Sequence, residues 1–312
     1  MQVSALLLNW NRRDDTLACL ASLQGLTIAP DELMVVDQGS EDGSVEALET
    51  AFPEVRILGL EKNVGVAAGR NLLASMAKGD LLWFLDNDAE LPPDALSKLL
   101  AGFEAHPEAA VLTMRVDNFY SGELDGPSWV YPANMLAKAG EPFESVVFAG
   151  GACGIRREVF WWAGGYDEDY FFSGEEEALA LRLMDLGYSL WYWPDSRLLH
   201  KVSPNRRISW GKERFYHYLH NRLATYIRHM PGWALPERLA MHLLGHGLQA
   251  ARNRICGQYL RAVGKLSHEL ASLYSDRRPV SALTWRRFCK LEKATRGAFL
   301  RRLRLELLRK RI

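Results

Sequence analysis

Short apolar runs alternate with amphipathic segments along the first 115 residues of the chain. Apolar runs of strand length, which are typical of buried strands, cover residues 3–9, 33–37, 55–60, 81–86 and 111–115. The segments between them place apolar residues at helical spacing and predict helices over 14–23, 43–52, 66–77 and 92–105. This regular alternation predicts an α/β fold with a mostly parallel sheet that helices cover on both faces.

Polar residues end three of the predicted strands, namely Asn9, Asp37 and Asp86. In sheets of this class, ligands bind in the crevice beyond the carboxyl ends of the strands. We therefore expect the three side chains to border one crevice.

The run that ends at Asp86 continues with Asn87 and Asp88, so two carboxylates stand one residue apart. Side chains two apart on a strand share a face, and together they can reach one ligand. Carboxylate oxygens are hard donors that suit Mg²⁺ or Mn²⁺ carrying a diphosphate. A solvated loop after a buried strand has the same local pattern, so the pair needs support from the rest of the chain.

Four further features carry candidate chemistry, and each has a structural alternative. Arg70, near the start of a predicted helix, suits a base or phosphate, or a surface ion pair. Gly150–Gly151 lets a ligand approach the backbone closely, as an ordinary turn also would. The acids at 175–177 either match the dipole of a helix start or supply a general base. His200, at the end of the last predicted core segment, is either structural or a metal ligand.

The regular pattern breaks at residues 117–148, where glycines and prolines predict a mobile or acceptor-side insertion. Order returns over 146–155, in a helix at 175–185 and in a strand at 188–193. From about Trp210 the chain consists of amphipathic helices rich in arginine.

Charge divides the chain in the same place. Residues 205–312 contain 24 Lys and Arg against 6 Asp and Glu, whereas residues 1–204 contain 14 against 32. We therefore predict two parts, an α/β domain at 1–204 and a basic helical region at 205–312. Residues 285–312 mix apolar and cationic side chains, which suits an anionic membrane surface, a solvated tail or a dimer contact. Nucleic acid is a poor fit, because no recognised binding motif accompanies the basic residues.

The location expected from the sequence is the cytoplasm. The N-terminus has no secretory pattern, and no apolar run reaches the length of a membrane span. The cysteines are far apart in sequence and predict free thiols in a reducing compartment: Cys19, Cys153, Cys256 and Cys289.

Taken in order, these residues resemble the family 2 glycosyltransferases with the GT-A fold, over roughly residues 3–202. The likeness is closest to bacterial enzymes that build surface polysaccharides, including rhamnosyltransferase-like members. The matching segments are 8–12, 36–44, 63–65, 86–88, 150–151, 156–160, 164–168, 174–182, 187–188 and His200.

The resemblance implies a role for each matching residue. Asp88 and His200 match ligands of an Mn²⁺ or Mg²⁺ ion, and Asp86 is a third candidate that also contacts ribose or sugar. Residues that match the nucleotide-sugar site are Asn9, Asn11, Asp37, Arg70, Asp86, Asn87, Gly150 and Gly151. Glu176 matches the catalytic acid, although the family usually has Asp there and a further acid where this chain has Ala178. Glu175 therefore remains a second candidate base.

The reaction implied is inverting transfer of a sugar from a UDP- or dTDP-linked donor to a hydroxyl of a glycan or lipid-linked glycan. Its setting would be cell-surface polysaccharide synthesis, in the cytoplasm or peripherally on the inner face of the cytoplasmic membrane. A GT-A domain that binds nucleotide sugar without transfer is the alternative. A dinucleotide-dependent oxidoreductase fits poorly, because residues 9–12 stand where its glycine-rich turn would follow the first strand.

Overall fold

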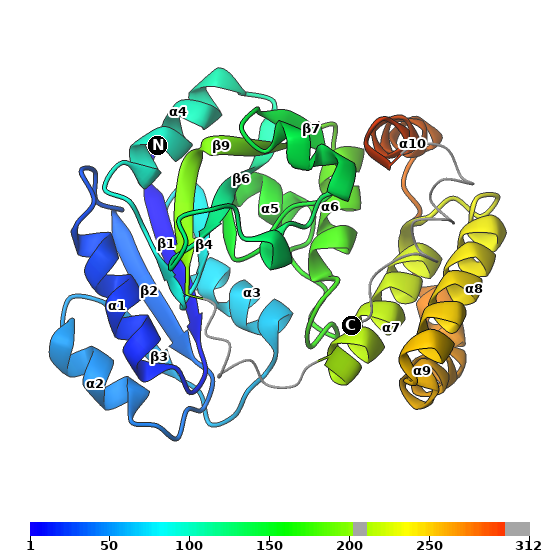
Figure 1. The fold of residues 1–312 in the computed structure, drawn as a ribbon, viewed down its shortest axis with the longest axis horizontal. Coiled ribbons are helices and arrows are strands. Elements are labelled where there is room, and N and C mark those ends of the chain that lie inside the picture. Colours follow the sequence, from blue (N-terminus) through cyan, green and yellow to red (C-terminus); the bar gives the residue numbers. More distant parts are fainter. Residues whose placement is uncertain (202–210, 297–312) are drawn as a thin grey trace.

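The computed structural model describes residues 1–201 and 211–296, and a nine-stranded sheet forms the centre of this part (Figure 1). The order of the strands is β3-β2-β1-β4-β8-β6-β9-β5, with β7 beside β9. The strands are β1 (Val3–Asn9), β2 (Glu32–Asp37), β3 (Arg56–Gly59), β4 (Leu81–Asp86), β5 (Ala89–Glu90), β6 (Ala109–Asn118), β7 (Phe143–Ser145), β8 (Ala152–Arg156) and β9 (Ser189–His200). The proposed boundary at 204/205 lies outside the described residues.

The sheet is parallel in its first half and mixed in its second. Strands β1 to β4 pair in parallel, whereas β8 runs antiparallel between β4 and β6. Strands β7 and β8 run opposite to β9 and β6, so the chain reverses its direction between β6 and β7, where no crossover α-helix intervenes. The predicted α/β fold is confirmed, and the parallel order holds as far as β4.

Helices cover both faces, and the alternating side chains of the strands divide between two buried clusters. Leu6 and Phe84 point to the cluster beneath α3, α5 and α6, while Leu7 and Leu85 point to the cluster beneath α1, α2 and α4. These helices are α1 (Arg13–Gln24), α2 (Ser44–Ala51), α3 (Val66–Met76), α4 (Ala95–Ala105), α5 (Arg157–Trp162) and α6 (Glu175–Asp185). Burial on both faces explains why the central strands are continuous apolar runs.

The insertion at 117–148 is packed against the sheet. It forms two 3₁₀ turns, Gly126–Ser128 and Ala133–Lys138, before β7. Tyr131 and Phe143 join Tyr192 of β9 in a separate buried cluster, with Trp129 against it. The aromatic side chains give this segment its own small core, which its glycines and prolines did not reveal.

Four helices follow the sheet domain in the described part: α7 (Gly211–His229), α8 (Leu235–Asn253), α9 (Cys256–Ser275) and α10 (Ala282–Arg296). Helix α7 packs on α6, and α8 and α9 lie on the side of α7 away from the sheet (Figure 1). Phe215, Leu219 and Leu223 of α7 belong to the same buried cluster as α3 and α6. The basic region therefore shares a core with the sheet domain.

The aromatic residues of α10 pack against other parts of the protein. Trp285 is 3% exposed, stacks on Phe288 with ring centroids 5.2 Å apart, and lies beneath Arg238. Apolar residues of the segment 285–312 that follow α10, among them Phe299, Leu303 and Leu307, lie outside the described residues. None of the helices in 1–201 and 211–296 is both long and apolar enough to cross a membrane.

Candidate functional site

A cavity of about 520 Å³ opens at the carboxyl ends of β1 and β4. The register of the sheet sets Asn9 opposite Asp37 and Leu8 opposite Asp86, so the ends of three strands meet there. The polar residues that line the cavity include Asn9, Asn11, Arg12, Arg70, Asp86 and Asn87. The structure thus brings together six polar side chains from three separate segments of the chain, residues 9–12, 70 and 86–87.

Asn9 forms the polar floor of this cavity. Its Nδ2 donates to Asp37 Oδ2 at 2.6 Å, and its Oδ1 accepts from Asn87 Nδ2 and Thr16 Oγ1, both at 2.8 Å. Asp37 is only 1% exposed and also accepts from the Ser40 amide at 2.8 Å. In this structure Asp37 therefore acts on the cavity through Asn9 rather than by lining it.

Asn11 lies at the rim in the left-handed region, with φ of 53°. Its Oδ1 accepts from the Glu41 amide at 2.8 Å, and its own amide donates to Ser40 Oγ at 2.8 Å. These bonds hold a conformation that asparagine tolerates better than most residues. They tie the loop after β1 to the loop after β2.

Arg70 is the centre of charge in the site. This buried side chain of α3 lies 3.4 Å from Oε1 of both Glu175 and Glu176, and 3.6 Å from Asp86 Oδ1. Burial by itself lowers the pKa of Arg70, but the surrounding acidic groups raise it above its usual range. One permanent cation therefore holds three carboxyl groups from two distant elements at one end of the cavity.

Gly150 and Gly151 pack directly against this charged cluster. A Cβ at Gly150 would stand 2.3 Å from Arg70 Nη1 and 2.5 Å from Glu176 Oε1. A Cβ at Gly151 would stand 1.9 Å from Asp86 Oδ1. Neither position has space for a side chain, so the paired glycines are required by this close approach.

Glu175 and Glu176 begin α6 and differ in their surroundings. The Glu175 side chain is 4% exposed and its Oε2 has no hydrogen-bond partner among the described residues, whereas 22% of the Glu176 side chain is exposed. Burial, followed by the charge of Glu176, raises the pKa of Glu175 to about 8. Glu175 thus tends to keep its proton, while Glu176 can be reached by a substrate.

Asp88 and His200 form a second polar group beside the cavity. Asp88 Oδ1 lies 3.2 Å from His200 Nε2, and Asp88 Oδ2 accepts from Arg12 Nη1 at 2.8 Å. Burial alone lowers the pKa of His200, but the hydrogen bond and charge of Asp88, with help from Asp125, raise it to about 9. Burial likewise would raise the pKa of Asp88, yet His200 and Arg12 lower it.

This pair has the chemistry of a divalent-cation site. The Nδ1 of His200 lies 3.0 Å from Oδ2 of Asp125, a 3%-exposed carboxylate that orients the ring and leaves Nε2 toward Asp88. The other carboxylate oxygen, Asp88 Oδ2, forms an ion pair with Arg12. In the described part of the chain, no three His, Cys, Asp or Glu side chains converge as a complete ligand set. Two protein ligands and a bound diphosphate would have to share the ion.

Arg12 and Asp125 were not among the residues singled out from the sequence. Arg12 ends the matching segment 8–12, but its contact with Asp88 depends on the turn before α1. Asp125 lies in the irregular insertion, next to Gly126 and Pro127, where the sequence indicates only a turn. No local pattern marks an acid as the partner of a histidine 75 residues away.

Comparisons with known proteins agree with this geometry. The model of glycosyl transferase family 2 matches residues 4–162. An N-acetylglucosaminyl-diphospho-decaprenol L-rhamnosyltransferase of Mycobacterium tuberculosis is 28% identical over 258 residues, covering 70% of this chain and 82% of that protein. Human polypeptide N-acetylgalactosaminyltransferase 10 is 29% identical over 192 residues, and the match covers 54% of this chain but only 32% of the human protein.

Solved structures show the same fold. The mannosyltransferase PcManGT from Pyrobaculum calidifontis, in complex with GDP-Man and Mn²⁺, has a TM-score of 0.59 at 19% identity, covering 98% of this chain and 83% of that one. S. aureus TarS 1-349 has a TM-score of 0.58 at 15% identity, covering 96% and 93%. The chain belongs to glycosyl transferase family 2, has the GT-A fold and is a glycosyltransferase, as its motifs predict.

Proposed function

We propose that the protein transfers a sugar, with inversion, from a nucleoside diphosphate sugar to a hydroxyl of a glycan or lipid-linked glycan in bacterial cell-surface polysaccharide synthesis. The observation that carries this proposal is the group of Arg70, Asp86 and Glu176 against Gly150–Gly151 at the cavity. Such a group offers a base and a cation for an anionic donor, and the paired glycines leave the space that these side chains occupy.

Glu176 is the proposed base. Its carboxylate takes the proton of the acceptor hydroxyl as the new bond forms to the anomeric carbon. The bond from that carbon to the diphosphate breaks on the opposite side, and its electron pair leaves with the diphosphate. Arg70 Nη1 lies 3.4 Å from Glu176 Oε1 and holds this side chain in place, and the buried Glu175 contacts the same guanidinium.

Asp88 and His200 are the proposed ligands of a divalent cation, Mn²⁺ or Mg²⁺. Bound there, the ion would neutralise the charge that develops on the departing diphosphate. The solved Pyrobaculum enzyme with GDP-Man and Mn²⁺ supports a divalent ion in this fold. Asp86 forms an ion pair with Arg70, with 3.6 Å between Oδ1 and Nη2, so we assign it first to the donor sugar or ribose.

The relatives support one class of donor and acceptor. The mycobacterial relative is named for rhamnosyl transfer to a decaprenol-linked acceptor, which supports a deoxyhexose and a lipid-linked glycan here. A thermal-shift screen of UDP-, dTDP- and GDP-sugars with Mn²⁺ tests this. We expect one nucleotide class to raise the melting temperature by several degrees and the others to leave it unchanged, because a ligand stabilises the state it binds. No shift with any donor would contradict the proposal.

A domain that binds nucleotide sugar without transferring it is the second candidate. It is favoured by one observation, the Glu175-Glu176 pair followed by Ala178, where the family pattern has an acid. Incubation of the stabilising donor with a lipid-linked acceptor, followed by detection of free nucleoside diphosphate, separates the two. Nucleotide release supports transfer, and donor binding without release supports the second candidate.

We also propose that the C-terminal helices bring the enzyme to an anionic membrane surface, where a lipid-linked acceptor would lie. The basic region exposes large apolar side chains, with Trp233 at 70%, Leu244 at 66% and Leu248 at 54%. Aromatic and aliphatic groups insert at the interface, and each nearby cation adds about 1 kcal/mol of attraction to anionic lipid.

Vesicle co-sedimentation tests the membrane contact. We expect the full chain to pellet with phosphatidylglycerol vesicles at low salt, and the triple variant Trp233→Ser, Leu244→Ser, Leu248→Ser to remain largely in the supernatant. Trp162→Ser is the control, since Trp162 is 58% exposed on α5 of the sheet domain. Equal pelleting of wild type and triple variant would exclude this surface. Truncation before α10 is unsuitable, because it would remove the buried Trp285.

A further inference from the structure

The loop between α5 and α6 brings the proposed base to the cavity. Phe171 and Phe172 of this loop line the cavity, and Glu175 and Glu176 begin α6 after two intervening residues. Ser173 and Gly174 both have positive φ, at +65° and +95°. Serine is disfavoured in this region, so other contacts must hold the turn in shape.

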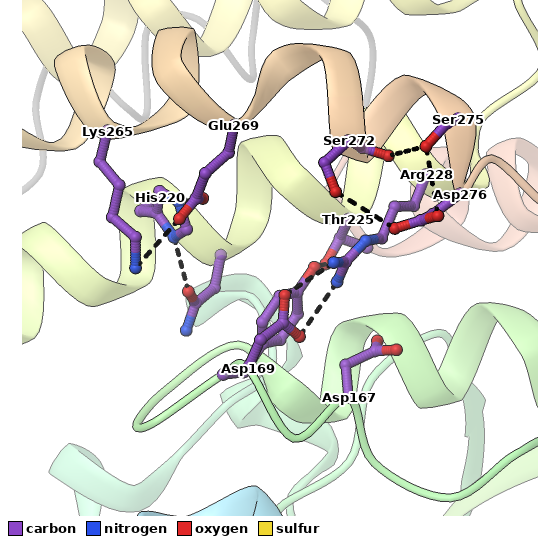
Figure 2. Close-up of polar contacts among 12 residues, drawn as sticks. Asp167, Asp169, His220, Thr225, Arg228, Lys265, Glu269, Ser272, Ser275 and Asp276 are labelled. Atoms are coloured by element: carbon purple, nitrogen blue, oxygen red, sulfur yellow. Dashed lines mark hydrogen bonds and ion pairs between the residues drawn. The ribbon is translucent and has the colours of Figure 1, made fainter.

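Helix α7 supplies contacts to the first half of the loop (Figure 2). Arg228 makes a two-pronged ion pair with Asp169, with N–O distances of 3.1 and 2.6 Å. The Thr225 hydroxyl lies 3.0 Å from the Tyr170 hydroxyl, and both residues are completely buried. One face of α7 therefore fixes Asp169 and Tyr170.

The same face fixes the turn itself through Asn221. The Asn221 Nδ2 donates to the carbonyl of Phe172 at 3.1 Å and to that of Ser173 at 2.7 Å. A Cβ built on Gly174 would stand 3.2 Å from the Asn221 Cβ, so this side chain also limits the turn sterically. Asn221 is 2% exposed and thus acts within the packed interior.

Asn221 is held in turn from the far side of α7. Its Oδ1 lies 2.9 Å from Nδ1 of His220, whose Nε2 lies 2.7 Å from Oε2 of Glu269 on α9 (Figure 2). These contacts fix the orientation of the Asn221 side-chain amide, because the carbonyls of Phe172 and Ser173 both need its NH₂ group as the donor. A chain of contacts thus runs from α9 through α7 to the residue that precedes Gly174.

We propose that Asn221 is a positioning residue for Glu176, so that the basic C-terminal region is part of the catalytic apparatus. This inference rests on the proposed function insofar as it takes Glu176 as the base. Asn221, Thr225 and Arg228 lie at helical spacing on one face of α7, and all three contact the loop that ends at the first turn of α6. Loss of the Asn221 amide releases the turn and lets Glu176 drift from Arg70.

The kinetic test is Asn221→Ala. We expect kcat to fall about 10- to 100-fold with a change in donor KM of less than about 3-fold, because a small misplacement of the base affects the transition state more than binding. Asn253→Ala is the matched control, since Asn253 also donates to a backbone carbonyl, that of Gln249 at 2.9 Å, but on α8. Equal kcat in both variants, measured well below their melting temperatures, would refute the proposal.

A double variant shows whether Asn221 works through Glu176. In the Glu176→Gln background, Asn221→Ala should lower the residual rate by less than about 2-fold, since the group that it positions is already inactive. A full additional loss would mean that Asn221 acts by another route. Full activity of Glu176→Gln alone would instead refute the assignment of Glu176 as the base. Amide hydrogen exchange would then test whether Asn221 positions the loop.

Amide hydrogen exchange tests the positioning without any turnover. In Asn221→Ala, amides of residues 171–176 should exchange at least about 10-fold faster than in wild type, while Asn253→Ala leaves them unchanged. Arg228→Gln breaks the ion pair with the exposed carboxylate of Asp169 and should accelerate exchange at 167–170. This variant replaces Asn221→Ala if Asn221→Ala does not fold. Unchanged exchange in the loop in either folded variant would overturn the role of α7.

Discussion

Glu176→Gln is expected to retain donor binding and to lose nearly all transfer. Glutamine keeps the shape of the side chain and its contact with Arg70, but it cannot accept the proton of the acceptor hydroxyl. Loss of such a group lowers the rate on the order of 10²-fold or more. Single-turnover kinetics measures the loss of transfer, and calorimetric titration of the donor on the same preparation measures the retained binding.

Glu175→Gln and Glu49→Gln are the matched controls. Glu175 already tends to hold a proton, because burial and its neighbour raise its pKa to about 8, so an amide imitates its usual state. We expect the transfer rate of Glu175→Gln to fall by less than about 10-fold, because only the contacts of the Glu175 side chain with its neighbours are weakened. Glu49 is exposed on α2 and should tolerate the change fully. A severe loss in Glu175→Gln beside an active Glu176→Gln would transfer the role of base to Glu175.

Removal of either proposed cation ligand is expected to have the second-largest effect. Asp88→Ala and His200→Ala should each weaken Mn²⁺-dependent donor binding by about 100-fold or more, because even the loss of a residue that only orients a metal ligand costs about 10- to 100-fold. Asp125→Asn should give a smaller loss, because it leaves the ligands and weakens only the orientation of the His200 ring. Calorimetric titration of donor at fixed Mn²⁺ gives the affinities, and excess chelator on wild type gives the reference.

The pH dependence of Mn²⁺ binding provides an independent readout of the same site. His200 has a pKa of about 9, so a proton on Nε2 must leave before this nitrogen can bind a cation. Affinity should therefore rise as pH increases from 6 to 9, by up to about tenfold per unit, and this slope should vanish in His200→Ala. Transfer that is insensitive to chelator and to both substitutions would refute the cation site.

The sequence determined the order of elements and the candidates at the strand ends. Strand and helix periods are local properties, so runs such as 81–86 and helices such as 66–77 could be located to within a few residues. The glycine pair at 150–151 and the acids at 175–176 could be assigned to a site only because other segments that match family 2 glycosyltransferases stand before and after them in the same order. The charge asymmetry likewise identified a basic region but not its place in the fold.

Tertiary structure decided which of these side chains meet. His200 reaches Asp88 because β9 pairs with β5, with Ala89 opposite His200, and no local pattern encodes that pairing. Tertiary packing likewise brings Asp125, from the insertion 117–148, to His200. It also brings Asn221, from helix α7 of the basic region, to the loop before α6. Side chains distant in sequence converge only through strand register and helix packing, and these depend on burial of the whole core rather than on any one segment.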